Sequence, residues 1–246
     1  MNIEPAANSE RRDGVLSGDR TALRELAKRY LDVCAREEQQ ERRRLWRAQN
    51  SLKAVRPLIY VRAFAWDEMA ESRCVCEEPF LREFEDFFRR SLFWDSLADD
   101  SIFEPWVTVS AVHVIPKEGL WGLPIRWIAN EDGRGSKRMD PALVNPEDAA
   151  RMVEPHHVID EVETERRVER ISDAIGDIIT INVDRAPVYR MWNGDISTRL
   201  AQLRGLDQLM LDMMERPEWL HGVLAFMRDG ILRTHEEAEQ AGDWRL

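Results

Sequence analysis

Short β-branched runs, separated by long helical stretches, are the feature that most constrains this chain. The clearest run is Ile178–Val183, which follows Gly176 and Asp177. Leu58–Val61 and Ile102–Val112 have the same character. Apolar runs of this length are typical of buried strands in parallel sheets, where a helix connects one strand to the next. The pattern therefore predicts an α/β protein with a mainly parallel sheet and right-handed crossovers.

Amphipathic helices are predicted before and between these runs. Residues 19–49 carry apolar side chains at helical spacing without Gly or Pro, which predicts one long helix. Pro79 suits the first turn of a helix whose Phe and Leu side chains share one face. Residues 160–175 form an acidic amphipathic pattern, and two further helices are expected over Leu206–Met213 and from Pro217 onward.

Turn-forming residues divide the chain further. Residues 115–150 are rich in Gly and Pro, which predicts an excursion from the core that contains a hairpin using Leu123–Ile128. We therefore expect a helical extension over residues 1–50, followed by a sheet-containing part over residues 51–246 with this excursion inserted in it.

The charge balance limits the partners. Lys and Arg total 35 against 46 Asp and Glu, and the net charge of −11 opposes general binding to nucleic acid or to anionic membranes. The five arginines within residues 36–47 are interpreted as a solvated face. No apolar run approaches the ~18 residues that span a bilayer, and the first residues lack the apolar core of a signal peptide. We therefore expect a soluble, cytoplasmic protein.

The order of these segments resembles the uroporphyrinogen decarboxylase-like superfamily, which includes the haem-pathway decarboxylase and the corrinoid-linked methyltransferases. The segments that carry the resemblance are RPLIYVRAFAWDEM, EEPFLREFEDFFRR, FEPWVTVSAV, GDIITINVD and RGLDQLMLDMMERPEWLHGVLAFMRDGIL. The best match is the block at 204–235, where a short helix, an Arg-Pro step and a second helix with an early His recur. The resemblance covers most of residues 50–246 and implies a partial (β/α)8 barrel with an N-terminal helical extension.

The resemblance implies that the chain holds about the first three β/α units of such a barrel. Barrel active sites are assembled from the loops of all the strands, and an open sheet leaves apolar edges uncovered. We therefore expect a homodimer or a missing carboxyl-terminal half as the partner. The zinc ligands of the methyltransferase branch belong to that half. No cofactor or metal site is evident in this chain, and zinc or a corrinoid partner is implied only for the methyltransferase interpretation.

The first candidate site residues follow Leu58–Val61. In the decarboxylases this strand leads into Met-Arg-Gln-Ala-Gly-Arg-Tyr, whose two arginines bind substrate carboxylates, and VRAFAWDEM places Arg62 on the first and Trp66 on the second. The planar guanidinium of an Arg suits a carboxylate or phosphate. An ion pair with Asp67 or Glu68 is the competing interpretation. Trp66 departs from the family pattern and argues against a tetracarboxylate porphyrinogen.

The second candidate is His113, after the Ile102–Val112 run. The decarboxylases carry a substrate-positioning Asp after this strand, and FEPWVTVSAV has no acid there, because Glu104 lies at the beginning of the strand. His113 is expected nearer the barrel mouth and suits an acid or base near neutral pH. An ordinary packing or loop histidine is the alternative.

Residues after Ile178–Val183 complete the candidate site. Asp184 and Arg185 follow the strand, and Gly194 with Thr198 resembles the Gly and Thr of the family's Gly-x-Pro-Phe-Thr turn. Asp195 is better explained as a helix cap. Three tryptophans that border the predicted strands suit a wall for a flat anionic ligand, with core packing as the alternative: Trp66, Trp106 and Trp192.

Two functions from different classes follow. The chain is interpreted as the amino-terminal portion of an enzyme that either decarboxylates a tetrapyrrole-type carboxylate or transfers a methyl group from a corrinoid, with a small anionic or tetrapyrrole-like ligand. The alternative is a non-enzymatic half-barrel that acts as an interaction or assembly module. A structural zinc site needs four ligands in paired spacings, which neither Cys74 with Cys76 nor His156 with His157 provides.

Overall fold

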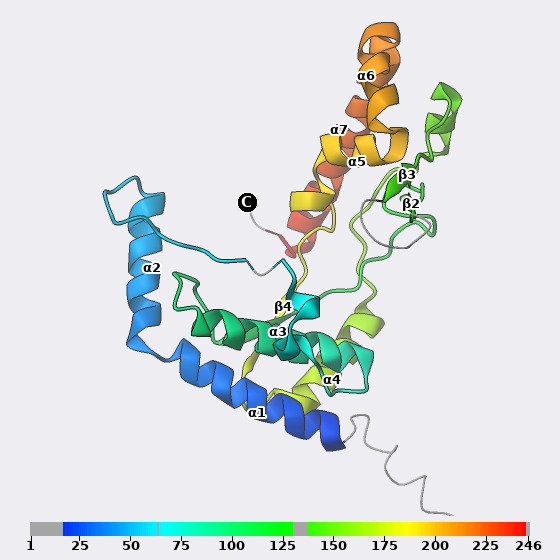
Figure 1. The fold of residues 1–246 in the computed structure, drawn as a ribbon. Coiled ribbons are helices and arrows are strands. Elements are labelled where there is room, and N and C mark those ends of the chain that lie inside the picture. The colour runs from blue at the N-terminus through cyan, green and yellow to red at the C-terminus, as the bar shows by residue number, and fades with distance from the viewer. Residues whose placement is uncertain (1–16, 63, 130–136, 245–246) are drawn as a thin grey trace, which may run out of the picture. The chain divides into compact units, whose positions relative to one another are not determined.

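The chain forms two compact units in the computed structural model, which describes residues 17–62, 64–129 and 137–244 (Figure 1). The first unit lies within Met1–Ser110 and Val162–Asp184, and the second within Ala111–Glu161 and Arg185–Leu246. The expected boundary near residue 50 is therefore not where the structure divides the chain. The helices before residue 50 belong to the first unit, together with the parallel strands.

The first unit combines helices with two strands. Its elements are α1 (Ser17–Cys34), α2 (Glu37–Asn50), the short 3-10 helices η1 (Trp66–Glu68) and η2 (Ala70–Ser72), α3 (Pro79–Ser96), β1 (Trp106–Ser110), α4 (Glu161–Ile175) and β4 (Thr180–Asp184). The second unit contains β2 (Arg126–Ile128), β3 (Arg138–Asp140), η3 (Pro146–Arg151), η4 (Met191–Asn193), α5 (Ile196–Arg204), α6 (Leu206–Glu215) and α7 (Pro217–Ala241). Mixed helix and sheet of this kind agrees with the general α/β class.

β1 and β4 pair in parallel, which confirms the two strands expected in these regions. The register sets Trp106 opposite Thr180 and Ser110 opposite Asp184. Pro105 lies immediately before β1, where its missing N–H removes no hydrogen bond from the ladder. α4 precedes β4 as expected, so the two strands are joined by a connection that contains a helix.

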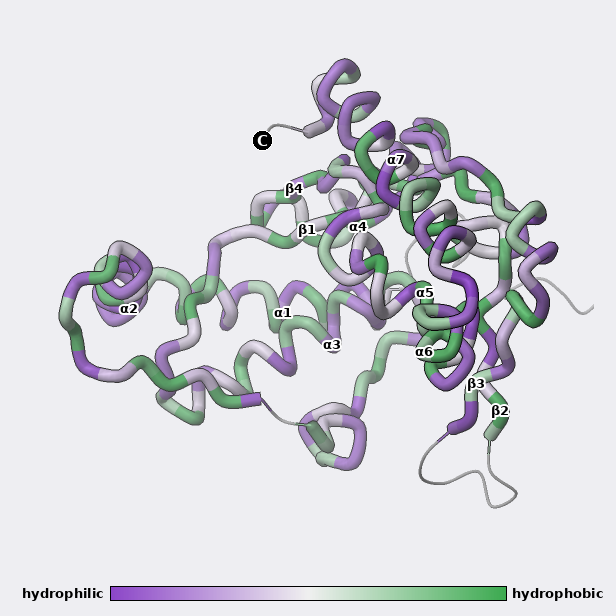
Figure 2. The backbone as a smooth tube through the Cα atoms, turned by 90° about the horizontal axis from the view of Figure 1, so that it is seen from above, coloured by the Kyte–Doolittle hydropathy of each residue, from purple (hydrophilic) through white to green (hydrophobic). Residues whose placement is uncertain are grey.

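One face of this small sheet is covered. Val107 and Val109 are buried against α1, α3 and α4, and Figure 2 shows α1 and α3 lying along each other. Thr108 and Asn182 lie on the other face, where the Asn182 side chain donates a hydrogen bond to Thr108 Oγ1 at 3.3 Å and both are exposed. The buried residues that α1, α3 and α4 add to this core include Leu23, Leu26, Tyr30, Leu81, Phe84, Phe88, Ile171 and Ile175.

The expected strand at Leu58–Val61 is not part of the sheet. Its backbone is not paired with a strand, and the side chains of Ile59 and Tyr60 are 61% and 53% exposed. The backbone N–H groups of Ile59 and Val61 donate to the carboxylates of Asp100 and Asp99, each at 2.8 Å. These carboxylates satisfy the N–H groups that a neighbouring strand would otherwise satisfy. The composition of this segment suited a strand, but the carboxylates of Asp99 and Asp100 accept from its N–H groups, and the Ile59 carbonyl accepts from the backbone N–H of Asp100 at 2.8 Å.

The expected long helix over residues 19–49 is broken at Ala35 and Arg36, where Arg36 adopts an extended conformation (φ −66°, ψ 148°). α1 packs against α3, whereas α2 binds the segment before β1. Gln39 accepts from the backbone N–H of Phe103 at 2.9 Å, and Arg43 donates to the Phe103 carbonyl at 2.8 Å. The break is therefore set by tertiary contacts. Part of the arginine-rich run is structural, contrary to its interpretation as a solvated face.

The second unit contains the expected excursion and the last helices. β2 pairs with β3 in an antiparallel hairpin, which confirms a hairpin in this region, although its strand begins at Arg126 rather than Leu123. Leu123 is instead buried in the core. Gly122 adopts φ 71°, and a Cβ there would lie 2.5 Å from Val153 Cγ2, so both its backbone conformation and its surroundings require glycine. The largest residues of this core are Trp121, Leu123, Leu143, Tyr189, Leu200, Leu203 and Met227.

Replacing Asp100 by Asn should destabilise the first unit in a pH-dependent manner. Hydrogen bonds from Arg56, at 2.5 and 2.8 Å, lower the pKa of Asp100 to about 2 from its usual 3.8. The carboxylate therefore stabilises the fold above pH 3.8, and this contribution is lost as the pH falls toward 2. We expect Asp100→Asn to lower the free energy of unfolding by about 2 kcal/mol at pH 7, measured by urea denaturation.

The difference between the wild type and Asp100→Asn should shrink as the pH is lowered from 7 to 3. Glu41→Gln is the control, because Glu41 forms an exposed pair with Arg44 and its replacement should leave the free energy of unfolding nearly unchanged. A difference that stays constant with pH would show that the Asp100 charge does not stabilise the fold.

Candidate functional site

The carboxyl ends of the parallel strands are the first candidate for a site, because ligands of α/β proteins bind beyond those ends. β1 ends at Ser110 and β4 ends at Asp184. The residues that follow along the chain belong to the second unit and include His113 and Arg185, both of which were predicted from the sequence. The contacts of these two residues define the candidate site.

Arg185 is held by two carboxylates. Its two terminal nitrogens donate to Glu161 at 2.9 and 2.6 Å, and its Nε donates to Asp243 Oδ1 at 2.5 Å. The hydrogen bonds to Glu161, and then those to Asp243, raise the pKa of Arg185. The bond from Arg185 lowers the pKa of Glu161 in turn. Because its donors already face carboxylates of the protein, Arg185 is a structural cation here rather than an open anchor for a ligand.

Asp243 connects this arginine to a buried histidine. Its Oδ2 lies 3.0 Å from Nε2 of His157, whose side chain is only 2% exposed. Burial raises the pKa of Asp243, but the hydrogen bonds from Arg185 and His157 outweigh burial and leave that pKa below its usual value. The His157 ring also packs against the ring of His113, with centroids 5.4 Å apart. We call Glu161, Arg185, Asp243, His157 and His113 the Arg185 network.

A short antiparallel contact positions the two histidines. His113 forms an isolated bridge with Ile159, and hydrogen bonds of 2.8 and 2.7 Å flank it, from Val114 N–H to Val158 and from Asp160 N–H to Val112. The backbone of His157 also donates to Glu237 of α7 at 2.7 Å. The segments around His113 and His157 are thereby held together and against the end of α7.

The chemical capacity of the Arg185 network lies in His157. When Asp243 accepts the Nε2 proton, the neutral imidazole carries its lone pair on Nδ1. This Nδ1 is buried and has no hydrogen-bond partner among the described residues. An imidazole oriented by a carboxylate in this way presents Nδ1 as a hydrogen-bond acceptor in a fixed direction. Sequence reasoning considered His157 only as a zinc ligand beside His156, and it missed Asp243, which lies 86 positions away and belongs to no motif.

Arg62 and Trp66 have different environments. Arg62 is exposed and forms no ion pair among the residues that the structure describes, so the expected pair with Asp67 or Glu68 is not formed there. Trp66 is 5% exposed, and its Nε1 donates to Asp86 at 2.6 Å while its ring packs against Phe93. Trp66 therefore anchors its own segment on α3.

The tryptophan wall is not formed as expected. Trp106 is the first residue of β1 and Asp184 is the last residue of β4, so the register separates them by four residues along the strands. At ~3.3 Å per residue this is roughly 13 Å. Trp106 thus lies at the amino end of the sheet and does not join Asp184 in one site. The physical reason is that Trp106 precedes the apolar run, whereas Asp184 follows one.

The turn around Gly194 has a structural role. Gly194 ends η4, and a Cβ there would lie 3.1 Å from the carbonyl oxygen of Tyr189. Asp195 caps α5 by accepting from the backbone N–H of Thr198 at 3.2 Å, which confirms the capping role predicted for it. Trp192, the third member of the expected wall, is 78% exposed in η4 of the second unit.

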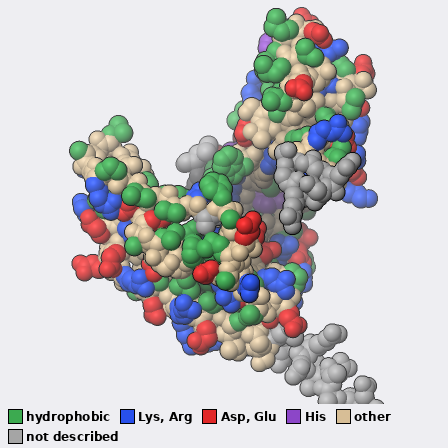
Figure 3. Space-filling view, viewed as in Figure 1, with side chains coloured by type: hydrophobic (Ala, Val, Ile, Leu, Met, Phe, Trp, Pro, Cys, Tyr) green, Lys and Arg blue, Asp and Glu red, His purple; other side chains and the backbone are tan. Residues whose placement is uncertain are grey.

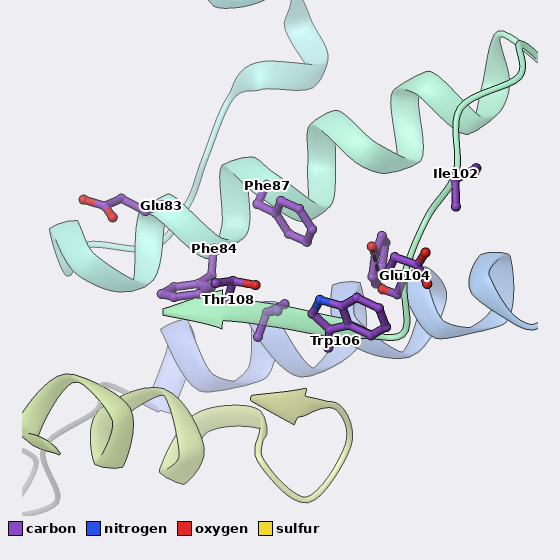
Figure 4. A pocket seen from close by; sticks show the side chains of 9 residues that line it. Glu83, Phe84, Phe87, Ile102, Glu104, Trp106 and Thr108 are labelled. Carbon is purple, nitrogen blue, oxygen red and sulfur yellow. Dashed lines mark hydrogen bonds between the residues drawn. The ribbon is translucent and has the colours of Figure 1, made fainter. Parts of the chain in front are cut away.

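A pocket of about 450 Å³ lies beside the amino-terminal half of β1. Figure 4 shows Phe84 and Phe87 projecting from α3 toward this strand, with Trp106 and Glu104 near its start. Glu104 forms an ion pair with Arg43 at 2.9 Å, and Glu83 is exposed. Two acidic side chains beside aromatic rings disfavour an anionic ligand. This pocket is therefore a poor match for the anion expected from the sequence.

Metal ligands do not converge in the described part of the chain. Over residues 17–62, 64–129 and 137–244, no group of three or more His, Cys, Asp or Glu side chains is placed to hold a metal ion. Cys34, Cys74 and Cys76 are free thiols. None of the helices in these ranges is long and apolar enough to cross a membrane.

Comparisons with known proteins return no relative. No family model matches the chain, and neither a curated protein nor a solved structure matches it.

Replacing Arg185 by Ala should test whether this residue is structural. The change leaves Asp243 buried without its cation, so we expect the free energy of unfolding to fall by about 2 kcal/mol at pH 7 in urea denaturation. Because the pKa of Asp243 is lowered in the folded protein, the loss should diminish as the pH falls below the usual value of 3.8. Arg166→Ala, which breaks an exposed pair with Glu163, is the control and should leave the free energy of unfolding nearly unchanged. If Arg185→Ala were as stable as the wild type, Arg185 would not be a structural residue, and it would again be a candidate for ligand binding.

Proposed function

We propose that this chain is the amino-terminal part of a uroporphyrinogen decarboxylase-like enzyme whose ligand is a tetrapyrrole-type anion. The observation that carries the proposal is the parallel pairing of β1 with β4 through a connection that includes α4. The resemblance assigns the second and third barrel strands to these two segments. A β/α repeat of this kind is the building unit of a (β/α)8 barrel.

The sheet edges support completion by further strands. Among the described residues, β1 and β4 pair in the sheet only with each other, so each strand has one edge that no further strand covers there. The extended residues 58–61 occupy the place in the sequence that the resemblance gives to the first strand. Their exposed apolar side chains are those of a strand that still needs a covering partner. In the proposed enzyme, the edges of β1 and β4 pair with further strands.

Arg62 is the residue that we assign to the ligand. It is exposed and unpaired among the described residues, whereas the donors of Arg185 are taken by Glu161 and Asp243. A guanidinium without a protein carboxylate can bind a carboxylate of the ligand in two parallel hydrogen bonds.

The parent reaction is either decarboxylation of a tetrapyrrole-type carboxylate or methyl transfer from a corrinoid. Both ligands contain a tetrapyrrole-derived macrocycle. Zinc and a corrinoid partner belong to the methyltransferase alternative, with the zinc ligands supplied by the carboxyl-terminal half of the barrel.

A non-enzymatic assembly module is the second candidate, and the two open sheet edges favour it. Such a half-barrel would dimerise or bind a separate chain through its edges.

Titration with a stable porphyrin should test the ligand. We expect uroporphyrin to bind with a shift of its Soret absorbance, and Arg62→Ala to weaken binding about tenfold through the loss of a charge-assisted hydrogen bond. Arg73→Ala is the matched control, because Arg73 is also exposed in the first unit and should leave the affinity unchanged. Binding of cobalamin but not of uroporphyrin would select methyl transfer. Binding of neither would contradict the proposed ligand class.

The mass in solution should show whether the chain associates, as both candidate functions require, or is a stable monomer. Light scattering coupled to size-exclusion chromatography at micromolar concentration should give a dimer or a broad distribution, because the open edges and exposed apolar residues favour association. A monodisperse monomer that melts cooperatively would contradict the assembly module and the need for further strands.

A further inference from the structure

The helix α6 inverts the usual pattern of a surface helix. Its two buried residues are Leu209 and the charged Asp212. Five apolar residues of the same ten-residue helix are between 51% and 84% exposed, namely Leu206, Met210, Leu211, Met213 and Met214. A helix on a protein surface normally buries its apolar stripe and exposes its charges. The arrangement therefore requires an explanation.

A buried ion pair holds α6 in this orientation. The Nε and a terminal nitrogen of Arg204 donate to Asp212 at 2.6 and 3.0 Å, and both side chains are at most 1% exposed. Arg204 also donates to the carbonyls of Leu143 and Val144, at 2.8 and 2.6 Å. Its hydrogen bond lowers the pKa of Asp212 to about 2. A buried pair is costly to desolvate, and what it can provide is a defined orientation. Here that orientation turns the leucine and methionine side chains outward.

The outward side chains form one surface. Leu206, Met210 and Met213 recur at helical spacing, and Met214 lies next to them. At about 100° per residue, Asp207 lies about 20° beyond Met214 around the helix, and Glu215 lies further round, beyond the exposed Leu211; both acids are exposed. Figure 3 shows hydrophobic and acidic side chains together over the part of the second unit where Figure 1 places α6. We call Leu206, Asp207, Met210, Met213, Met214 and Glu215 the α6 face.

Methionine-rich apolar surface suits a helical partner. Methionine side chains are flexible and polarizable, so they adapt to the side chains of a bound amphipathic helix. Several exposed apolar residues gathered on one helix mark an interaction surface more often than scattered ones do.

The charges around the α6 face select the partner. Asp207, Glu215 and Glu218 are exposed acids, whereas Arg216 is already held by Asp212 and Glu215 at 3.0 and 3.6 Å. The net charge of the whole chain is −11. A second copy would bring the same acids against each other, which is unfavourable. A helix that carries Lys or Arg beside its apolar stripe complements both features.

We propose that the α6 face is a docking site for a basic amphipathic helix of a partner protein. The docked helix places its apolar stripe on Met210 and Met213, and its cations beside Asp207 and Glu215. This site stands on the second unit alone and does not depend on a tetrapyrrole ligand. The two proposals can therefore fail independently.

The test is a fluorescence-anisotropy titration of the full chain with a labelled amphipathic peptide of Leu and Lys. We expect saturable binding that weakens as salt is added, because the acids contribute through screened charges. The variant Met210→Gln/Met213→Gln should bind at least tenfold more weakly. Both side chains are more than half exposed, so the variant should fold normally, which thermal melting followed by circular dichroism checks.

Three controls make the result specific. Met191→Gln, at a residue 75% exposed in η4, should bind like the wild type. Asp207→Lys/Glu215→Lys should lose most of the salt dependence, and a matching peptide of Leu and Glu should not bind. Equal binding by wild type and Met210→Gln/Met213→Gln would overturn the proposal. Self-association that the same variant abolishes would also overturn it, by showing that a second copy occupies the α6 face.

Discussion

The parallel contact between β1 and β4 is the interaction on which the first unit depends. It joins segments more than 70 residues apart and gives α1, α3 and α4 a common apolar surface through Val107 and Val109. The chain passes into the second unit after Ser110 and again after Asp184, the carboxyl ends of the same two strands. The two strands thus set both the core of the first unit and the places where the second unit begins.

Charged side chains position several segments that apolar packing leaves exposed. Asp99 and Asp100 bind the backbone of the extended residues before η1, and Arg204 with Asp212 orients α6. In the Arg185 network, one guanidinium holds Asp243 beside His157. Each arrangement satisfies a buried charge with a defined partner, as burial requires. Such contacts fix the orientation of these segments. The apolar residues next to them stay exposed and are available for contact with other surfaces.

Local signals in the sequence predicted the elements well where local chemistry decides them. Pro79 begins α3, Asp195 caps α5, and the apolar runs after Pro105 and Asp177 became β1 and β4. Distant contacts explain the failures. Gln39 and Arg43 reach the segment before β1 only if the helix breaks at Ala35, and neither Gly nor Pro marks that break. Periodicity alone could not show it.

The candidate site was only partly predictable for the same reason. The strand ends directed attention to His113 and Arg185, whereas the partners of Arg185 come from the start of α4 and the end of α7. The sequence predicted Trp106 at the same end of the sheet as Asp184, but it lies at the other end. A residue that borders a predicted strand can lie at either end of it. The sequence did not predict that the α6 face is exposed, because its apolar residues have the spacing of a stripe that is normally buried. Which side of that helix is covered depends on Arg204, a residue of the preceding helix.

Hydrogen exchange measured across the whole chain, with and without uroporphyrin, tests the central claim most directly. If Arg62 binds the ligand, the porphyrin should slow exchange in the backbone of residues 58–62 and leave α6 unchanged. Protection confined to other segments, or no protection at saturating porphyrin, would contradict the assignment of Arg62 to the ligand.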